Sequence, residues 1–255
     1  MDSQTTVAVL AIVFSVISVV LSGWFSIRAA RISAELEADR ERRQEEQSAI
    51  KAAQGVYEPL AQAAAELQSR IYNIVETGWV KTVERYKSHG DYAVTSTAFL
   101  FAHYFGWIEA RRQAVLASSG EGGRDETVQG LIDGVRSTLR RSEDDEGFLF
   151  FAAEQRAIGE LVFSWQPTRD AEAREPYVLG YAAFSVRYQD DEDFRQWFTS
   201  IDTGIERVSS GDHRRLIDIH RALVALIPEL DPKHKYTSGY ALEPISPPST
   251  ESRQT

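Results

Sequence analysis

The chain has 255 residues, no cysteine, and 38 acidic against 28 basic side chains, which gives a formal net charge of -10. The lack of cysteine excludes disulfides, thiolate catalysis, palmitoylation and cysteine-ligated zinc, and it agrees with a reducing compartment. Nucleic-acid binding needs a basic surface for phosphate contacts, so we expect no nucleic acid among the partners of this acidic chain.

An apolar segment near the start predicts a membrane anchor. Residues 7–27 contain no ionisable side chain and are long enough to cross the roughly 30 Å hydrocarbon core as one helix. A cleaved signal peptide is the alternative, but residues 1–6 carry an acid and no base, and no small-residue cleavage site follows. We therefore expect a transmembrane helix, with the lipid bilayer as a partner.

The basic residues around this segment predict its orientation. None precedes it, whereas Arg28 and Arg31 follow it directly. The positive-inside rule then places residues 1–6 outside and the C-terminal part in the cytoplasm. The Arg-rich, Asn-poor composition is typical of GC-rich bacterial coding. The expected location is thus the bacterial inner (plasma) membrane, crossed once.

Small residues gather on one face of the predicted span. They recur at steps of three and four at Ala8, Ala11, Ser15, Ser18, Ser22 and Ser26. Small side chains let two helices approach closely in lipid, which favours self-association of the span. The alternative is that Ala and Ser are simply common in spans. The sequence therefore predicts a homo-oligomer of undefined stoichiometry.

Residues 28–55 follow as a charged segment rich in Arg, Glu, Ala and Gln. Pairs such as Asp39–Arg43 and Arg42–Glu46 have the i,i+4 spacing of a solvated helix. The heptad phase of the span continues into this segment, which favours a parallel coiled coil near the membrane. We expect a charged helical stalk.

A mainly α, multi-helix globular domain is predicted over residues 56–236. Apolar side chains at helical spacing indicate helices over 59–76, 79–86, 92–118, 128–139, 153–165, 194–208 and 216–230. The segment 92–118 is the most apolar of these, and we expect a buried core helix there rather than a second span. Asp212 is the expected cap of the last helix, and Pro228 and Asp231-Pro232 are expected to close it.

Two short segments and the C-terminal tail are less regular. Residues 148–151 fit either a short buried strand or an approach to the next helix. In 176–188, Pro176 fits a helix start, yet Phe184, Val186 and Tyr188 alternate as in a strand. Residues 237–255 are rich in Pro, Ser and Thr, and we expect them to be disordered.

The chain lacks phosphate-loop, zinc-protease and serine-hydrolase motifs, so the candidate sites are clusters of polar residues. The stripe of Glu66, Arg70 and Asn73 lies on one expected helix, and the stripe of Glu154, Arg156 and Glu160 on another. If the two met across a cleft near His103, they could bind an anion or transfer a proton. The alternative is a local i,i+4 ion pair without a ligand.

No cofactor or metal is expected. His213 and His220 lie seven residues apart on one expected helix, but the spacing provides no third ligand.

Five segments resemble an uncharacterised bacterial family of helical proteins. They are ELQSRIYNIV (66–75), AHYFGWIEARR (102–112), EQRAIGE (154–160), LGYAAF (179–184) and ALVALIPELDP (222–232). The resemblance covers about residues 57–235 and implies a single folded unit. It implies no activity or ligand.

These patterns together predict a membrane-anchored protein that presents a cytoplasmic helical domain to an unidentified protein partner. Tethering raises the local concentration of such a domain without new contacts. One alternative is a membrane-localised enzyme or small-ligand sensor that uses Glu154, Arg156 and Glu160. Another is an oligomeric membrane effector.

Overall fold

A computed structural model of the chain describes residues 28, 36–37, 40, 55–86, 91–117, 123–141, 147–168, 174–209, 211 and 213–245. The chain divides into two units, Met1–Lys51 and Ala52–Thr255. The predicted span over 7–27, with its small residues from Ala8 to Ser26, lies outside the described residues, and so does Asp212. In the first unit, Arg28, Leu36, Glu37 and Arg40 are helical and exposed. Coiled-coil pairing stays a prediction.

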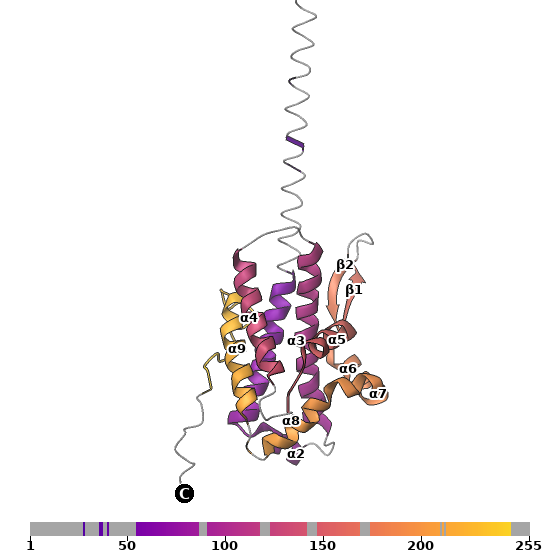
Figure 1. Ribbon diagram of the computed structural model, residues 1–255, viewed down its shortest axis with the longest axis vertical. Coiled ribbons are helices and arrows are strands. Elements are labelled where there is room, and N and C mark those ends of the chain that lie inside the picture. Colours follow the sequence, from indigo (N-terminus) through magenta and orange to yellow (C-terminus); the bar gives the residue numbers. More distant parts are fainter. Residues whose placement is uncertain are drawn as a thin grey trace, which may run out of the picture. The chain divides into compact units, whose positions relative to one another are not determined.

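The second unit is mainly α-helical (Figure 1). It begins with a helix over residues 55–76, which we call the first bundle helix. The later elements are α2 (Trp79–Tyr86), α3 (Asp91–Ala117), α4 (Gly123–Arg140), α5 (Ala152–Val162), β1 (Phe163–Pro167), β2 (Arg174–Val178), α6 (Tyr181–Asp190), α7 (Glu192–Arg195), η1 (Gln196–Phe198), α8 (Thr199–Ser209) and α9 (Arg214–Leu230). No helix in the described ranges is long and apolar enough to cross a bilayer.

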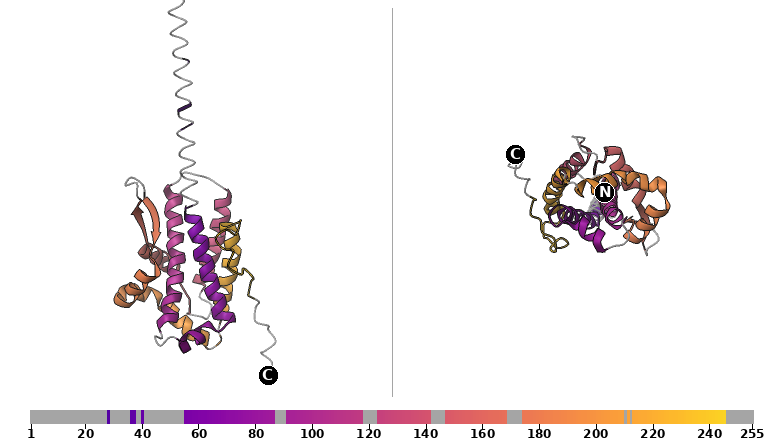
Figure 2. Two further views of the ribbon diagram at one scale, coloured as in Figure 1. Left: turned by 180° about the vertical axis from the view of Figure 1, so that it is seen from behind. Right: turned by 90° about the horizontal axis from the view of Figure 1, so that it is seen from below.

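Four helices form a bundle around the main core. Figures 1 and 2 show the first bundle helix, α3, α4 and α9 side by side. Their apolar stripes meet inside it, where the fully buried side chains include Leu60, Leu67, Ile71, Phe101, Tyr104, Ile132, Leu139, Leu223 and Leu226. Burial of each large apolar side chain is worth roughly 1.5–3 kcal/mol. The predicted core helix over 92–118 is confirmed as α3.

The elements from α5 to α8 cover the other side of α3. Helix α5 lies close to α3 because both helices have a glycine at the contact. A Cβ on Gly159 would lie 2.7 Å from the Phe105 carbonyl oxygen of α3, and one on Gly106 would lie 2.8 Å from Val162 of α5. The strands β1 and β2 then form an antiparallel hairpin in which Phe163 pairs with Val178.

Residues 148–151 form no strand. Phe148 and Phe150 are buried, and their amides donate to the carbonyls of Ser200 and Leu139 respectively. Phe148 has a φ of 55°, so the chain turns there before it enters α5. The segment is therefore the approach to a helix, which was the second of the two expectations.

The helix expected over 153–165 ends at Val162, and its last three expected residues belong to β1 (Phe163–Pro167) instead. The segment 176–188 contains both expected structures in the opposite order: Pro176 lies in strand β2, and Phe184 and Tyr188 lie in helix α6. These two side chains are one helical turn apart and both buried, whereas Val186 is 59% exposed. The apparent alternation therefore did not mark a strand.

Two further expectations for the C-terminal part are wrong in detail. The helix expected over 194–208 is divided into α7, η1 and α8, and Asp191 begins α7 by accepting from the Phe194 amide at 2.9 Å. The N-cap of α9 is His213 rather than Asp212, and Pro228 lies inside the helix, whereas the helix ends at Leu230 before Asp231 and Pro232 as expected.

Part of the tail expected to be disordered is packed. Arg221 donates to the carbonyl of Ile245 at 2.9 Å, and Gln68 donates to that of Ala241 at 3.1 Å. Ile245 and Thr237 are buried. Apolar and hydrogen-bonding groups in residues 237–245 thus outweigh the flexible composition, while residues 246–255 lie outside the described ranges.

Candidate functional site

Arg70 of the first bundle helix is held by α3 and α2. Its Nη1 donates to Ser96 Oγ at 2.8 Å and to Thr97 Oγ1 at 3.1 Å. Its guanidinium carbon lies 3.8 Å from the ring centroid of Trp79. Burial lowers the pKa of Arg70 to about 10, so the group stays cationic at neutral pH. Two hydroxyls and one indole face thus engage this cation within the fold.

His103 lies beside the same stripe. Its Nε2 accepts a hydrogen bond from Trp107 Nε1 at 3.1 Å, which assigns the ring proton to Nδ1. Nδ1 lies 3.9 Å from Glu66 Oε2. Burial lowers the pKa of His103 to about 4 and raises that of Glu66. His103 is therefore neutral at pH 7, and its basic nitrogen is occupied by Trp107, which argues against a role as a general base.

Asn73 ends this stripe. Its backbone carbonyl accepts from both the amide and the hydroxyl of Thr77, at 3.2 and 2.8 Å. These bonds lie at the C-terminal end of the first bundle helix, where carbonyls lack intrahelical partners. This backbone contact is structural.

The second predicted stripe lies on α5. Glu154 Oε2 accepts from the amide of Phe151 at 2.7 Å, so it closes the first turn of that helix. Arg156 Nε donates to Glu160 Oε1 at 2.8 Å, and about half of each side chain is exposed. This is the local i,i+4 pair that the sequence left open as the alternative, and such exposed pairs contribute little stability.

The two stripes lie beside different faces of α3. His103 faces Glu66, whereas Phe105 and Glu109 contact Gly159 of α5. His103 and Phe105 are two residues apart, which places them about 200° apart around an α-helix. The structure thus brings Glu66, Arg70 and His103 together, and separately Arg156 and Glu160. It does not bring the two groups into one cavity.

A small cavity opens beside Arg156. It has a volume of about 120 Å³ and is lined by Phe105, Ile108, Glu109, Arg112, Arg136, Gln155 and Arg156. We call it the arginine cavity, because α3, α4 and α5 each contribute one guanidinium group. The sequence pointed to Arg156 but not to its neighbours, since residues from three separate helices meet only in the folded chain.

Glu109 is the acidic residue of the arginine cavity and is almost fully buried. Its carboxylate accepts from Arg112 Nε at 2.7 Å, from Arg112 Nη2 at 2.5 Å and from Gln113 Nε2 at 2.8 Å. Burial alone raises the pKa of Glu109, but these hydrogen bonds outweigh burial, so its pKa lies below its usual value. Glu109 is therefore a charged and fully engaged anchor for Arg112.

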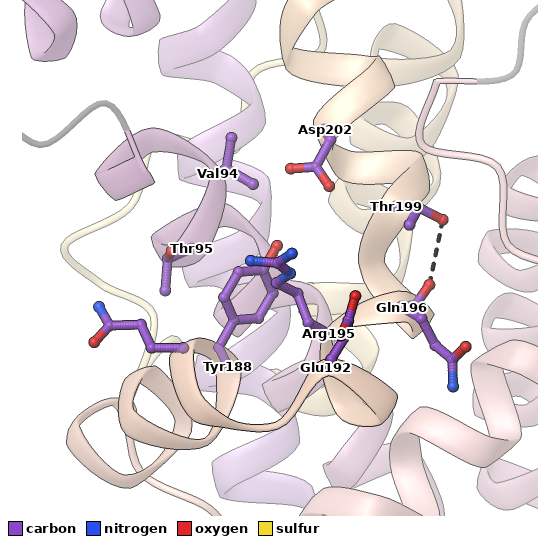
Figure 3. Close-up of a pocket in the computed structure, with 9 residues that line it drawn as sticks. Val94, Thr95, Tyr188, Glu192, Arg195, Gln196, Thr199 and Asp202 are labelled. Carbon is purple, nitrogen blue, oxygen red and sulfur yellow. Dashed lines mark hydrogen bonds between the residues drawn. The ribbon is translucent and has the colours of Figure 1, made fainter.

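A larger cavity of about 380 Å³ lies between α3 and the segment from α6 to α8 (Figure 3). In Figure 3, the side chains of Tyr188, Arg195 and Asp202 point into the space between these helices. Its lining also includes Val94, Thr95, Gln189, Glu192, Gln196 and Thr199. None of the residues predicted from sequence lines it. Its polar side chains have the spacing of any solvated helix face, so the sequence alone did not indicate this cavity.

The histidines do not form a metal site in the described part of the chain. No group of three His, Cys, Asp or Glu side chains that could hold a metal ion occurs among the described residues. His220 is buried on α9, where its Nε2 lies 2.7 Å from Gln68 Nε2.

Comparisons with protein-family models, curated proteins and solved structures find no match to the chain. The resemblance of residues 57–235 to a bacterial helical family therefore stays a prediction.

Proposed function

We propose that this protein is anchored in the bacterial inner membrane by residues 7–27 and presents its helical domain in the cytoplasm as an interaction module. The observation that carries the proposal is the uncharged run from Val7 to Ile27, followed directly by Arg28 and Arg31. Such a run favours insertion, and the basic residues favour retention of their side in the cytoplasm.

The contacts of the polar residues support binding rather than catalysis. Arg70 is held by Ser96, Thr97 and Trp79, and the basic nitrogen of His103 is occupied by Trp107. A general base needs a free lone pair near a substrate, and the lone pair of His103 Nε2 is already engaged by Trp107.

Exposed aromatic side chains support a role in protein contacts. Trp165 and Tyr177 on the hairpin and Tyr181 at the start of α6 are 39%, 37% and 38% exposed. Tyrosine and tryptophan are enriched at protein interfaces, because they combine a large apolar area with a polar group.

The membrane topology can be tested directly, because the natural chain has no cysteine. Single substitutions Ser3→Cys and Ser252→Cys each introduce one reactive thiol into the full-length chain. We expect a membrane-impermeant maleimide to label Ser3→Cys in intact spheroplasts and Ser252→Cys only after permeabilisation. Alkaline carbonate should leave both variants in the pellet. Release of uncleaved protein by carbonate would contradict the anchor, and reversed labelling would contradict the orientation.

Self-association of the span is the second part of the proposal. Ser18→Cys and Ser22→Cys place thiols on the face of small residues, and Val20→Cys places one about 200° away from Ser18. We expect oxidant to crosslink the two serine variants and to leave the valine control monomeric. Ser18→Leu with Ser22→Leu should weaken association in a reporter assay. Equal crosslinking at all three positions would contradict a defined seam.

A further inference from the structure

We propose that the arginine cavity binds hydrogen phosphate, held between Arg136 of α4 and Arg156 of α5, with Gln155 as the acceptor for the phosphate O–H. This site goes beyond the role as a membrane-anchored interaction module. The cavity volume of about 120 Å³ suits one small oxyanion rather than a larger metabolite.

The charge of the lining favours an anion. Three arginines and one glutamate line the cavity, a formal charge of 3 − 1 = +2 in a chain whose net charge is -10. The glutamate, Glu109, is neutralised by a two-pronged bond from Arg112. Arg136 and Arg156 each have one acid nearby outside the lining, Asp133 at 3.8 Å and Glu160 at 2.8 Å. An anion is therefore attracted mainly by the unused N–H donors of these two guanidinium groups, which suit oxyanions because they form a fork.

Both of these arginines have donors to spare. Arg156 gives its Nε to Glu160, and no hydrogen bond from its two Nη atoms to a described residue is seen. Among the described residues, the ion pair recorded for Arg136 is 3.8 Å from Nη1 to Asp133 Oδ1, which is too long for a hydrogen bond. The two side chains are 33% and 55% exposed, so a dissolved anion can reach them.

Gln155 adds a second kind of contact. It is only 4% exposed, and its Nε2 donates to the carbonyls of Phe150 at 2.8 Å and Arg136 at 3.2 Å. These two bonds fix the orientation of the amide. Its Oε1 is buried and has no hydrogen-bond partner among the described residues. An unpaired buried acceptor is costly, so a ligand that donates an O–H there gains binding energy.

This acceptor distinguishes between oxyanions of similar size. Hydrogen phosphate carries an O–H at neutral pH, whereas sulfate carries none and would direct only lone pairs at Gln155 Oε1. A site that hydrogen-bonds one group of a ligand rejects an analogue that lacks it, because its buried polar group is then left unpaired. We therefore expect a preference for phosphate over sulfate, which net charge alone would not produce.

Calorimetric titration of the full-length protein in detergent micelles tests the site. Sodium phosphate should release or absorb heat with saturation, and it should raise the melting temperature relative to sodium chloride at equal ionic strength. Sodium sulfate should bind about tenfold more weakly than phosphate, since it cannot donate to Gln155 Oε1 and leaves that buried acceptor unpaired.

The variants Arg136→Gln and Arg156→Gln should each weaken phosphate binding by about tenfold or more. Arg140→Gln is the matched control, because Arg140 is exposed on the same helix as Arg136, one turn further on, and does not line the cavity. Both cavity arginines are partly exposed, so their substitution should leave the fold intact, which the melting temperature without phosphate checks. Absence of phosphate binding, unchanged binding in both cavity variants, or equal affinity for sulfate would each overturn the proposal.

Discussion

The close contact between α3 and α5 should depend on the absence of a side chain at Gly159. This glycine is buried on α5, and a Cβ placed on it would lie 2.7 Å from the carbonyl oxygen of Phe105 and 3.1 Å from Glu109 Cβ. The first obstacle is backbone, which cannot rotate away as a side-chain end can. Gly159→Ala therefore requires α5 to move away from α3 by a few tenths of an ångström.

Two opposing effects set the size of the change. Overpacking of a well-packed contact costs typically about 1–3 kcal/mol, and a backbone obstacle favours the upper part of that range. Alanine in a helix interior returns up to about 1 kcal/mol relative to glycine. We expect Gly159→Ala to lower the free energy of unfolding by about 1–2 kcal/mol, which corresponds to roughly 3–6 °C in melting temperature for a domain of this size.

The control is Gly134→Ala in α4. Gly134 is an exposed helical glycine, and nothing lies within 4 Å of the position that a Cβ would occupy, so only the gain in helix propensity applies. We expect this variant to be more stable by about 0.5–1 kcal/mol. Urea unfolding followed by tryptophan fluorescence measures both variants. If both raised stability, the packing of α5 on α3 described above would be wrong.

Three further predictions concern buried polar groups. Burial lowers the pKa of His103 and of His220 to about 4 from 6.5, so the unfolded chain binds protons that the folded chain does not as pH falls below 6.5. The free energy of unfolding should fall between pH 6.5 and 4 by about 3 kcal/mol for each histidine, and His220→Gln should remove part of this dependence in urea titrations. Asp231→Ala should lower stability by about 2–3 kcal/mol and speed amide exchange in the turn that follows, because its carboxylate accepts from three backbone amides and one hydroxyl there. Arg70→Lys should cost about 1–2 kcal/mol and change the fluorescence of Trp79, since lysine cannot reproduce the two-hydroxyl contact and the stacking together.

The helices of the bundle could be predicted from sequence because each has an apolar stripe at a helical period. Leu60, Leu67 and Ile71 lie at that spacing and are all buried. The hairpin could not be predicted in the same way. Trp165 is 39% exposed although it continues the apolar spacing of α5, so periodicity extended the helix past its end at Val162. Only the contact with the later strand defines β1.

The sequence identified two polar stripes and left open whether they meet across a cleft or form a local ion pair. Spacing along one helix showed that Arg156 and Glu160 could pair, and they do at 2.8 Å. Whether they also meet Arg70 depends on which face of α3 each helix covers, and that is a long-range property. Gly106 and Gly159 partly indicate this packing in the sequence, because the lack of a side chain allows α5 to lie against a different face of α3 from the first bundle helix.

The position of α3 explains why most polar clusters beside it are structural. Neighbouring elements cover it on several sides, so polar side chains at its edges lose water when the chain folds and need protein partners in its place. Arg70 meets this need by donating a hydrogen bond to Ser96. Glu109 meets it by accepting one from Arg112. Gln155 meets it only through its Nε2, although it lines a cavity with two arginines that have donors to spare. An anion from solution would pair with the unused arginine donors and with the unpaired Gln155 acceptor at once. Such unpaired donors and acceptors, rather than the number of charged residues, distinguish a binding site from an ion-pair network.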